Sequence, residues 1–411
     1  MFFAEKKFFG KIFLWVLCVV CTGCLKTSDW VHFRGEGGRG ASPVRISPPL
    51  GVRWKIQLQP EDQKIDFFNP PVVMGDTVYF GSADKNFYAW DLESGYMRWV
   101  FKSGGAINAI PVADQKQVYF ASRDGKVYAL SRQDGREMWN FLTRSQVNSQ
   151  VERYGDYVVF VSDADAVYFL SPDGKEEFSL DNPGWYNFTF LMHDEVMYFA
   201  TGPKVSLIGP YDIHKKDFLW FLPYREIAAG WYSFPAVWKD MLFFGTADYD
   251  HGMQLGYYGF DRRTGKLIWD QQREADWNRY AADDYEVAEL FMRNVELLDF
   301  MAPAVWKDLV IFTGGDITAR AFDAKTGAIR WEQSFAMPIS SAPSIAGDRV
   351  YFGTVGDEIY PPQLVCVSAR NGKTLWQMET DGAVLSAPVI AGKRIVFGTD
   401  KSVFYVLEEV F

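Results

Sequence analysis

One phrase recurs along this chain: an apolar run, a polar turn that contains a glycine, and a tryptophan four residues after that glycine. Counting the weaker copies in the middle of the chain, successive copies lie roughly 40 to 60 residues apart, the period of a repeat that folds as one small four-stranded sheet. The pattern therefore predicts a β-propeller, in which such sheets surround a central axis. The clear copies are Gly95 and Trp99, Gly135 and Trp139, Gly265 and Trp269, Gly327 and Trp331, and Gly372 and Trp376.

A second mark opens the repeats: a proline, two apolar residues, a polar turn and a strand rich in Val, Tyr and Phe. Two degenerate repeats keep only the strand, at residues 157–160 and 196–199. With these the chain has eight openings, so we expect an all-β, eight-bladed propeller of four-stranded blades over residues 45–411. The openings that carry the proline begin at Pro71, Pro111, Pro235, Pro303, Pro343 and Pro388.

The blade-closing positions are one fewer than the openings. The eighth repeat reaches Phe411 without a closing strand, whereas residues 52–58 have the closing pattern, with Trp54, and no opening strand before them. We expect the two termini to meet in this last blade, because such closure leaves no unpaired sheet edge. The seven closing positions are Trp99, Trp139, Phe178, Trp220, Trp269, Trp331 and Trp376.

The repeated residues have structural explanations. An indole ring can cover the seam between two blades while its N–H finds a backbone partner, and a glycine permits a turn with positive φ. Cys366 stands in the slot that other repeats give to a small residue such as Ala89 or Ala129. We therefore interpret Cys366 as a core residue and not as a nucleophile.

The N-terminus has the order of an export signal. Three lysines precede an apolar run over residues 12–20, which is too short for a membrane-spanning helix. The ending Thr22-Gly23-Cys24 resembles a bacterial lipobox, although Cys21 stands where leucine is usual. The resemblance implies a signal peptide over residues 1–23, acyl chains on Cys24, a tether over residues 24–44 and a place at the outer membrane, facing the periplasm. An ordinary signal peptide with incidental cysteines is the alternative.

The repeated phrase, Ala-x-Asp-x-x-x-Gly-x-x-x-Trp at residues 89–99, resembles the PQQ-like β-propeller repeat of quinoprotein dehydrogenases and of the outer-membrane assembly lipoproteins of the BamB family. The second resemblance implies a non-catalytic, lipid-anchored scaffold that docks a protein partner of the outer-membrane assembly machinery and needs no cofactor. A propeller that binds a small ligand or an envelope glycan is the alternative. The dehydrogenases hold their quinone against a vicinal cysteine pair, whereas after residue 24 this chain has only Cys366. A PQQ-dependent enzyme is therefore the third interpretation.

Two adjacent openings share an aromatic phrase that the other repeats lack. It places Trp185 and Tyr186 in the fourth repeat and Trp231 and Tyr232 in the fifth. Because these segments lead into the innermost strands, we expect the four side chains near one mouth of the central channel, as a candidate site for a partner or ligand. The alternative is that they only fill the channel.

The stretch at about residues 272–298 is too long for a blade turn, and its apolar residues recur near helical spacing among acidic ones. We predict a helical insertion on one face of the disc, either for a partner or as a packed cap. Residues 248–251, Asp-Tyr-Asp-His, lack the ligand spacing of a calcium loop. The sequence predicts no metal site and no catalytic residue, and a net charge of −10 disfavours nucleic acid.

Overall fold

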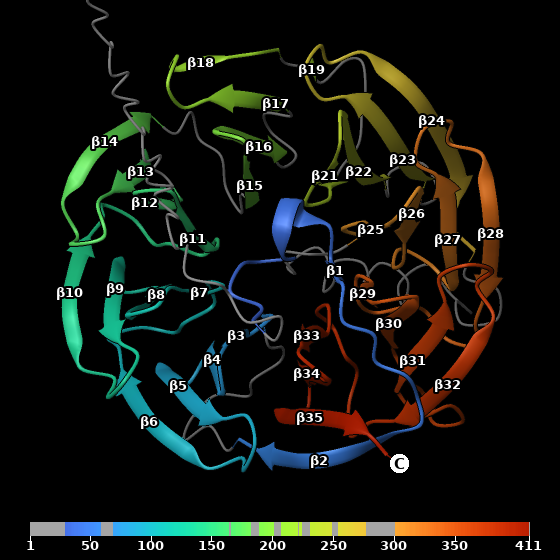
Figure 1. Ribbon diagram of the computed structural model, residues 1–411, viewed down its shortest axis with the longest axis horizontal. Helices are drawn as coiled ribbons and strands as arrows, with labels where there is room; N and C mark the ends of the chain where they lie inside the picture. The colour runs from blue at the N-terminus through green and yellow to red at the C-terminus, as the bar shows by residue number, and fades with distance from the viewer. Residues whose placement is uncertain are drawn as a thin grey trace, which may run out of the picture.

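The computed structural model describes residues 29–58, 69–163, 166–181, 189–200, 207–220, 222–223, 231–248, 254–276 and 301–410. Eight sheets of mainly antiparallel strands form a ring, each with its first strand toward the centre and its last strand at the rim (Figure 1). The predicted all-β, eight-bladed propeller is confirmed. Among the described residues no helix is long and apolar enough to span a membrane.

Blades 1 to 4 follow one another along the chain as simple meanders, so each strand pairs with its neighbours in sequence. In blade 4 a short fifth strand, β19 (Leu222–Pro223), also pairs with β17. The strands are β3 (Val72–Met74), β4 (Thr77–Gly81), β5 (Asn86–Asp91) and β6 (Met97–Lys102); β7 (Val112–Ala113), β8 (Gln117–Ala121), β9 (Lys126–Ser131) and β10 (Glu137–Leu142); β11 (Val151–Tyr154), β12 (Tyr157–Val161), β13 (Ala166–Leu170) and β14 (Glu176–Asp181); and β15 (Thr189–His193), β16 (Val196–Ala200), β17 (Leu207–Asp212) and β18 (Asp217–Phe218).

Blades 5 to 8 repeat the meander with two additions. In blade 5 the innermost position is shared by β20 and β21, which both pair with β22, and in blade 7 the short β1 adds a parallel inner strand to β29. The strands are β20 (Trp231–Tyr232), β21 (Ala236–Trp238), β22 (Met241–Asp248), β23 (Gln254–Asp261) and β24 (Leu267–Glu274); β25 (Ala304–Trp306), β26 (Leu309–Phe312), β27 (Thr318–Asp323) and β28 (Ile329–Ser334); β1 (Ala41–Ser42), β29 (Ser344–Ala346), β30 (Arg349–Thr354), β31 (Gln363–Ser368) and β32 (Thr374–Glu379); and β33 (Val389–Ala391), β34 (Arg394–Gly398), β35 (Val403–Glu409) and β2 (Leu50–Gln57).

Blade 8 joins the two ends of the chain. Its outer strand is β2, which pairs antiparallel with β35 from Leu50 opposite Glu409 to Gln57 opposite Val403. This is the pairing that the closing pattern of residues 52–58 predicts. Trp54 then lies at the rim of blade 8 and packs on Phe404 of the same blade, with ring centroids 6.1 Å apart.

The rim seams share one arrangement. At six seams the indole N–H of the closing tryptophan donates to a backbone carbonyl in the outer turn of the next blade, over 2.9–3.1 Å. The turn glycine of that next blade lies flat against the same ring, and a Cβ added at Gly135 would come within 2.6 Å of Trp99. Gly135 also has a φ of 71°, so both the space and the backbone require glycine. The sequence interpretation of tryptophan and glycine is confirmed.

The other two seams differ for identifiable reasons. Phe178 closes blade 3, and the Lys216 ammonium of blade 4 lies 4.9 Å from its ring centroid. Trp376 of blade 7 faces blade 8, whose outer strand comes from the N-terminal side and offers no equivalent turn; its ring packs against the apolar cluster around Phe404 and Tyr405.

The segment before β2 differs from the tether expected over residues 24–44. From residue 29 it lies against the disc, and Figure 1 shows it, with the 3-10 turn η1 (Glu36–Gly38), at the centre of the ring. Trp30 exchanges two backbone hydrogen bonds with Val73 of blade 1, and Phe33, 3% exposed, packs edge-on against Phe234 of blade 5. We call residues 29–46 the lead-in segment.

The insertion predicted at about 272–298 is only partly within the described residues. Residues 272–274 belong to β24, so the strand extends farther than expected. Asp276 then bonds to blade 6: its backbone N–H donates to the buried Asp316 carboxylate and its carbonyl accepts from Ile317. The rest of the predicted helix, from residue 277, lies outside the described residues.

Candidate functional site

The residues predicted to bind a membrane or a partner are mostly outside the description. Cys24, Trp185 and Tyr186 lie in segments that the structure does not describe. Trp231 and Tyr232 form β20, whose backbone pairs with Ala247 and Thr246 of β22 at the inner edge of blade 5. The placement of β20 agrees with an inner-strand position, and the proposed grouping of the four aromatic side chains stays a prediction.

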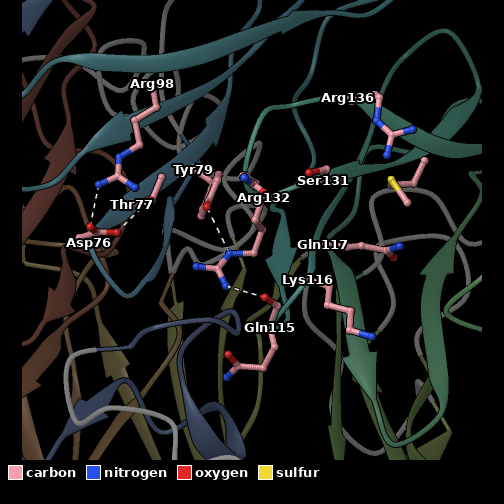
Figure 2. A pocket seen from close by; sticks show the side chains of 12 residues that line it. Asp76, Thr77, Tyr79, Arg98, Gln115, Lys116, Gln117, Ser131, Arg132 and Arg136 are labelled. Carbon is pink, nitrogen blue, oxygen red and sulfur yellow. Dashed lines mark hydrogen bonds and ion pairs between the residues drawn. The ribbon is translucent and has the colours of Figure 1, made fainter.

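The structure shows a different pocket at the seam between blades 1 and 2, on the face formed by the tight turns of each blade (Figure 2). We call it the seam pocket. Its volume is about 540 Å³, within the range of small-ligand sites. The turn after β3, the turn before β8 and the turn between β9 and β10 supply its walls. Lining residues that the argument uses are Asp76, Arg98, Lys116, Gln117, Arg132 and Arg136.

Arg132 is fixed at the base of the seam pocket. Its guanidinium donates to the Tyr79 hydroxyl and to the carbonyls of Met74, Asp114 and Gln115, over 3.1–3.2 Å. Every one of these acceptors is neutral. Arg132 therefore ties two blades together, and among the described residues its guanidinium has no carboxylate partner.

Arg98, on the blade 1 side, is neutralised. It lies 2.7 Å from the Asp76 carboxylate and 2.5 Å from that of Asp91. The hydrogen bond from Arg98 holds the pKa of Asp76 below its usual value. The Asp76 carboxylate of the folded protein is therefore ionised at neutral pH. Asp76 is the one acidic residue that lines the pocket.

Two exposed cations complete the lining on the blade 2 side. Within the described part of the chain, neither Lys116 nor Arg136 forms an ion pair. Asp134, in the same turn but outside the lining, bonds to Ser131 and to the backbone of Arg136, and these hydrogen bonds, with the nearby charge of Arg136, lower its pKa. The Gln117 side-chain oxygen is buried in the described structure without a hydrogen-bond partner. Of the charged residues that line the seam pocket, four are basic and one is acidic, in a protein of net charge −10.

The seam between blades 4 and 5 gives a matched contrast. Arg262 occupies the turn position of Arg132 and donates to the Tyr198 hydroxyl, as Arg132 does to Tyr79. Arg262 also lies 2.7 Å from the carboxylate of Asp194. The charge that stays unpaired at the first seam is therefore neutralised at this one.

A second cavity, of about 770 Å³, lies on the same face between the lead-in segment and blades 6 and 7. Its charges are largely paired: Arg39 with Glu36 at 2.7 Å, and Arg45 with Asp348 at 3.3 Å. The Lys307 ammonium lies 4.6 Å from the ring centroid of Trp306. We therefore regard the seam pocket as the stronger candidate for a charged ligand.

One ion pair fixes the lead-in segment to blade 3. His32 bonds through Nδ1 to the Glu152 carboxylate. Burial lowers the pKa of His32, but the charge and hydrogen bond of Glu152 outweigh burial and leave this pKa above its usual value. The contact is therefore charged and strongest on the acidic side of neutrality.

The remaining predicted sites carry no chemistry in the described structure. No group of His, Cys, Asp and Glu within it could hold a metal ion, and of residues 248–251 only Asp248 is described, at the end of β22. Cys366 is fully buried in blade 7, and burial raises the pKa of its thiol to about 12. It is a core residue, as predicted.

Sequence reasoning missed the seam pocket because its residues come from turns that look like ordinary solvated loops. The available signal was an arginine directly after a repeat's third strand, at 132 and again at 262. Whether such an arginine is neutralised depends on the inner turn of the preceding blade. That turn supplies Asp194 to Arg262 but Gly75 to Arg132, and this difference is evident only once the turns lie side by side in the structure.

Comparison with known proteins agrees with this architecture. The family model described as outer membrane protein assembly factor BamB matches residues 51–176, 256–361 and 315–410, which together span more than half of the chain. No curated protein matches.

Several solved structures are similar. The crystal structure of BamB from Moraxella catarrhalis has a TM-score of 0.63 at 17% identity and covers 87% of this chain and 99% of its own. Quinohemoprotein alcohol dehydrogenase from Comamonas testosteroni has a TM-score of 0.68 at 14% identity, covering 93% and 80%. The computationally designed Ika8 protein has a TM-score of 0.64 at 15% identity, covering 85% and 98%. At such identities the likeness shows the fold alone.

Proposed function

The chain belongs to the family of outer membrane protein assembly factor BamB, and we propose that it acts as a non-catalytic scaffold in the assembly of outer-membrane proteins. In this proposal the acyl chains of Cys24 hold the disc at the periplasmic side of the outer membrane, and its loops dock a protein of the assembly machinery. The observation that carries the proposal is the family match, which covers blades from both the N-terminal and the C-terminal half of the chain.

The anchor has its own test. Acyl chains contribute about 0.8 kcal/mol per buried CH₂, and more than one chain is needed for stable attachment. We expect Cys24→Ser to release the protein from membranes and to abolish incorporation of labelled palmitate, with Cys21→Ser as the matched control that keeps both. Palmitate incorporation by Cys24→Ser would place the acylation elsewhere.

Docking is tested by pull-down from gently solubilised membranes. We expect a β-barrel protein of the assembly machinery as the main partner. If Trp185 and Trp231 are binding anchors, Trp185→Ala and Trp231→Ala should each weaken the affinity for the partner by about 2 kcal/mol, or about 30-fold, with little loss of stability. A large fall in melting temperature with capture retained by the folded fraction would mean that these side chains only fill the channel.

Two alternatives remain in other classes. A propeller for a small ligand or an envelope glycan is favoured by the seam pocket, whose volume suits such a molecule. A quinone-dependent dehydrogenase shares the fold, but the vicinal cysteine pair that this resemblance requires has no counterpart after residue 24. Activity gained on addition of pyrroloquinoline quinone would support the enzyme and contradict the scaffold.

A further inference from the structure

The point where the described chain begins lies beside the seam pocket. The Asp29 carboxylate accepts a 2.7 Å hydrogen bond from the backbone N–H of Gly75. Gly75 precedes Asp76 of the pocket lining, and a Cβ added to it would lie 4.0 Å from the Arg132 guanidinium. Asp29 therefore lies on the tight-turn face, next to Arg132.

The distance to the proposed anchor is short. Cys24 stands five positions before Asp29, and a fully extended chain reaches at most about 18 Å over that length. If Cys24 is acylated, its lipid lies within that reach of Asp29. The tight-turn face would then lie close to the membrane surface, and the opposite face would be the one left for partners.

The chemistry of this face suits a phospholipid surface. Among the described residues Lys116, Arg132 and Arg136 form no ion pair, although the Asp134 carboxylate lies near Arg136, and each basic side chain near an anionic membrane adds attraction. Exposed apolar groups lie on the same face: Met138 lines the pocket at 45% exposure, and Tyr96, 78% exposed, lies in the turn between β5 and β6 of blade 1. Tyrosine is a residue that favours the headgroup level of a bilayer.

We propose that the seam pocket binds the phosphate headgroups of anionic phospholipids and so holds the tight-turn face of the disc against the membrane. Arg132 provides a fixed charge at the base of the pocket, and the exposed side chains of Lys116 and Arg136 bind the phosphate from the pocket's mouth. The proposal rests on the acylation of Cys24 for its orientation argument, but the pocket's affinity for the headgroup does not require the anchor. An acidic segment of a protein is the competing occupant, and the anchor's proximity favours the membrane.

The test uses the full mature chain with Cys24→Ser, so that no acyl chain contributes. Co-sedimentation is measured with vesicles of phosphatidylcholine alone and with added phosphatidylglycerol, in about 0.1 M salt, where charges still act over roughly 10 Å. We expect binding only to the anionic vesicles, and a loss of about tenfold or more on Lys116→Gln with Arg136→Gln. Both side chains are exposed, so the melting temperature should stay unchanged.

The matched control removes two exposed lysines from the opposite face, Lys102→Gln with Lys401→Gln. The control should keep vesicle binding. A control that loses as much as the pocket variant, equal binding to neutral and anionic vesicles, or binding of polyglutamate in place of vesicles would each overturn the proposal.

Failure of the anchor and failure of the headgroup site give different results. If palmitate labelling of the unmodified protein fails while the Cys24→Ser chain still binds anionic vesicles through Lys116 and Arg136, the pocket stands and the anchor is wrong. If labelling succeeds and the vesicles are not bound, the anchor stands and the headgroup site is wrong.

Discussion

The rim and the centre of this disc are held together by different means. At the rim, one indole, one carbonyl and one glycine recur at six seams, each joining two successive repeats. At the centre, a single lead-in segment contacts blades 1, 3, 5, 6 and 7 through contacts that occur once each, including the Arg34 guanidinium on the Pro303 carbonyl at 2.8 Å.

The difference concerns how stability is distributed. A rim seam is one of many nearest-neighbour interfaces in a repeat array, so its loss is felt by the whole cooperative ring. The lead-in segment lies on the ring without completing any blade except for the two-residue β1, so its loss should be local. Four measurements can break or sharpen this comparison.

The largest effect should come from removing residues 52–58. The deletion takes away most of β2 and exposes the edge of β35 and the apolar face of blade 8. We expect aggregation or a strongly lowered melting temperature, because an open sheet edge recruits other chains. Trp54→Ala, which keeps the strand, should remain monomeric with a smaller loss. An unchanged melting temperature and a monomeric elution profile for the deletion would refute closure by β2.

A single seam should come next. Trp99 is 9% exposed, donates to the Arg132 carbonyl and packs on Gly135. Trp99→Ala should cost about 3 to 5 kcal/mol of unfolding free energy, measured by denaturant unfolding. Tyr96→Ala is the matched control in the same blade, since Tyr96 is 78% exposed. Equal losses in the two variants would mean that the seam is not where rim stability lies.

The centre should respond locally. Phe33→Ala removes the edge-on contact with Phe234, whose ring centroid is 4.6 Å away. We expect faster hydrogen exchange over residues 30–46 with blade amides unchanged, because local opening of the lead-in segment leaves the blade ladders intact. Val44→Ala, a half-buried neighbour, serves as the control. Loss of protection throughout the blades would show that the centre is part of the cooperative ring.

The smallest effect should be the pH dependence of the contact between His32 and Glu152. Because the pKa of His32 is raised in the folded protein, the ion pair stabilises fully below the ordinary histidine pKa of about 6.5 and its contribution is lost as pH rises through the raised value. Proteolysis of the lead-in segment should therefore quicken as pH rises across that window. Glu152→Gln should flatten the profile; a profile that is unchanged by this substitution would assign the pH dependence to another group.

The sequence determined the repeat architecture. Each seam joins the tryptophan of one repeat to the turn glycine of the next, about 40 residues later. The surplus of one opening over the closing positions indicated how the two ends of the chain pair. Both signals could be found in the sequence because they are local properties of strands and turns. The lead-in segment was misjudged as a tether. Its packing follows from contacts with distant blades: Gly38, for example, is glycine because a Cβ would come within 2.6 Å of the Pro235 carbonyl of blade 5.

Only the tertiary structure decided where charge is left unpaired. Arg132 and Arg262 stand in equivalent turns with equivalent tyrosine partners, and the sequence around them does not say which one meets a carboxylate. That depends on the turn of the preceding blade, more than fifty residues away for each of them. The same holds for the contact of Asp29 with Gly75, since a contact between distant segments is fixed by closure of the ring and not by any local pattern.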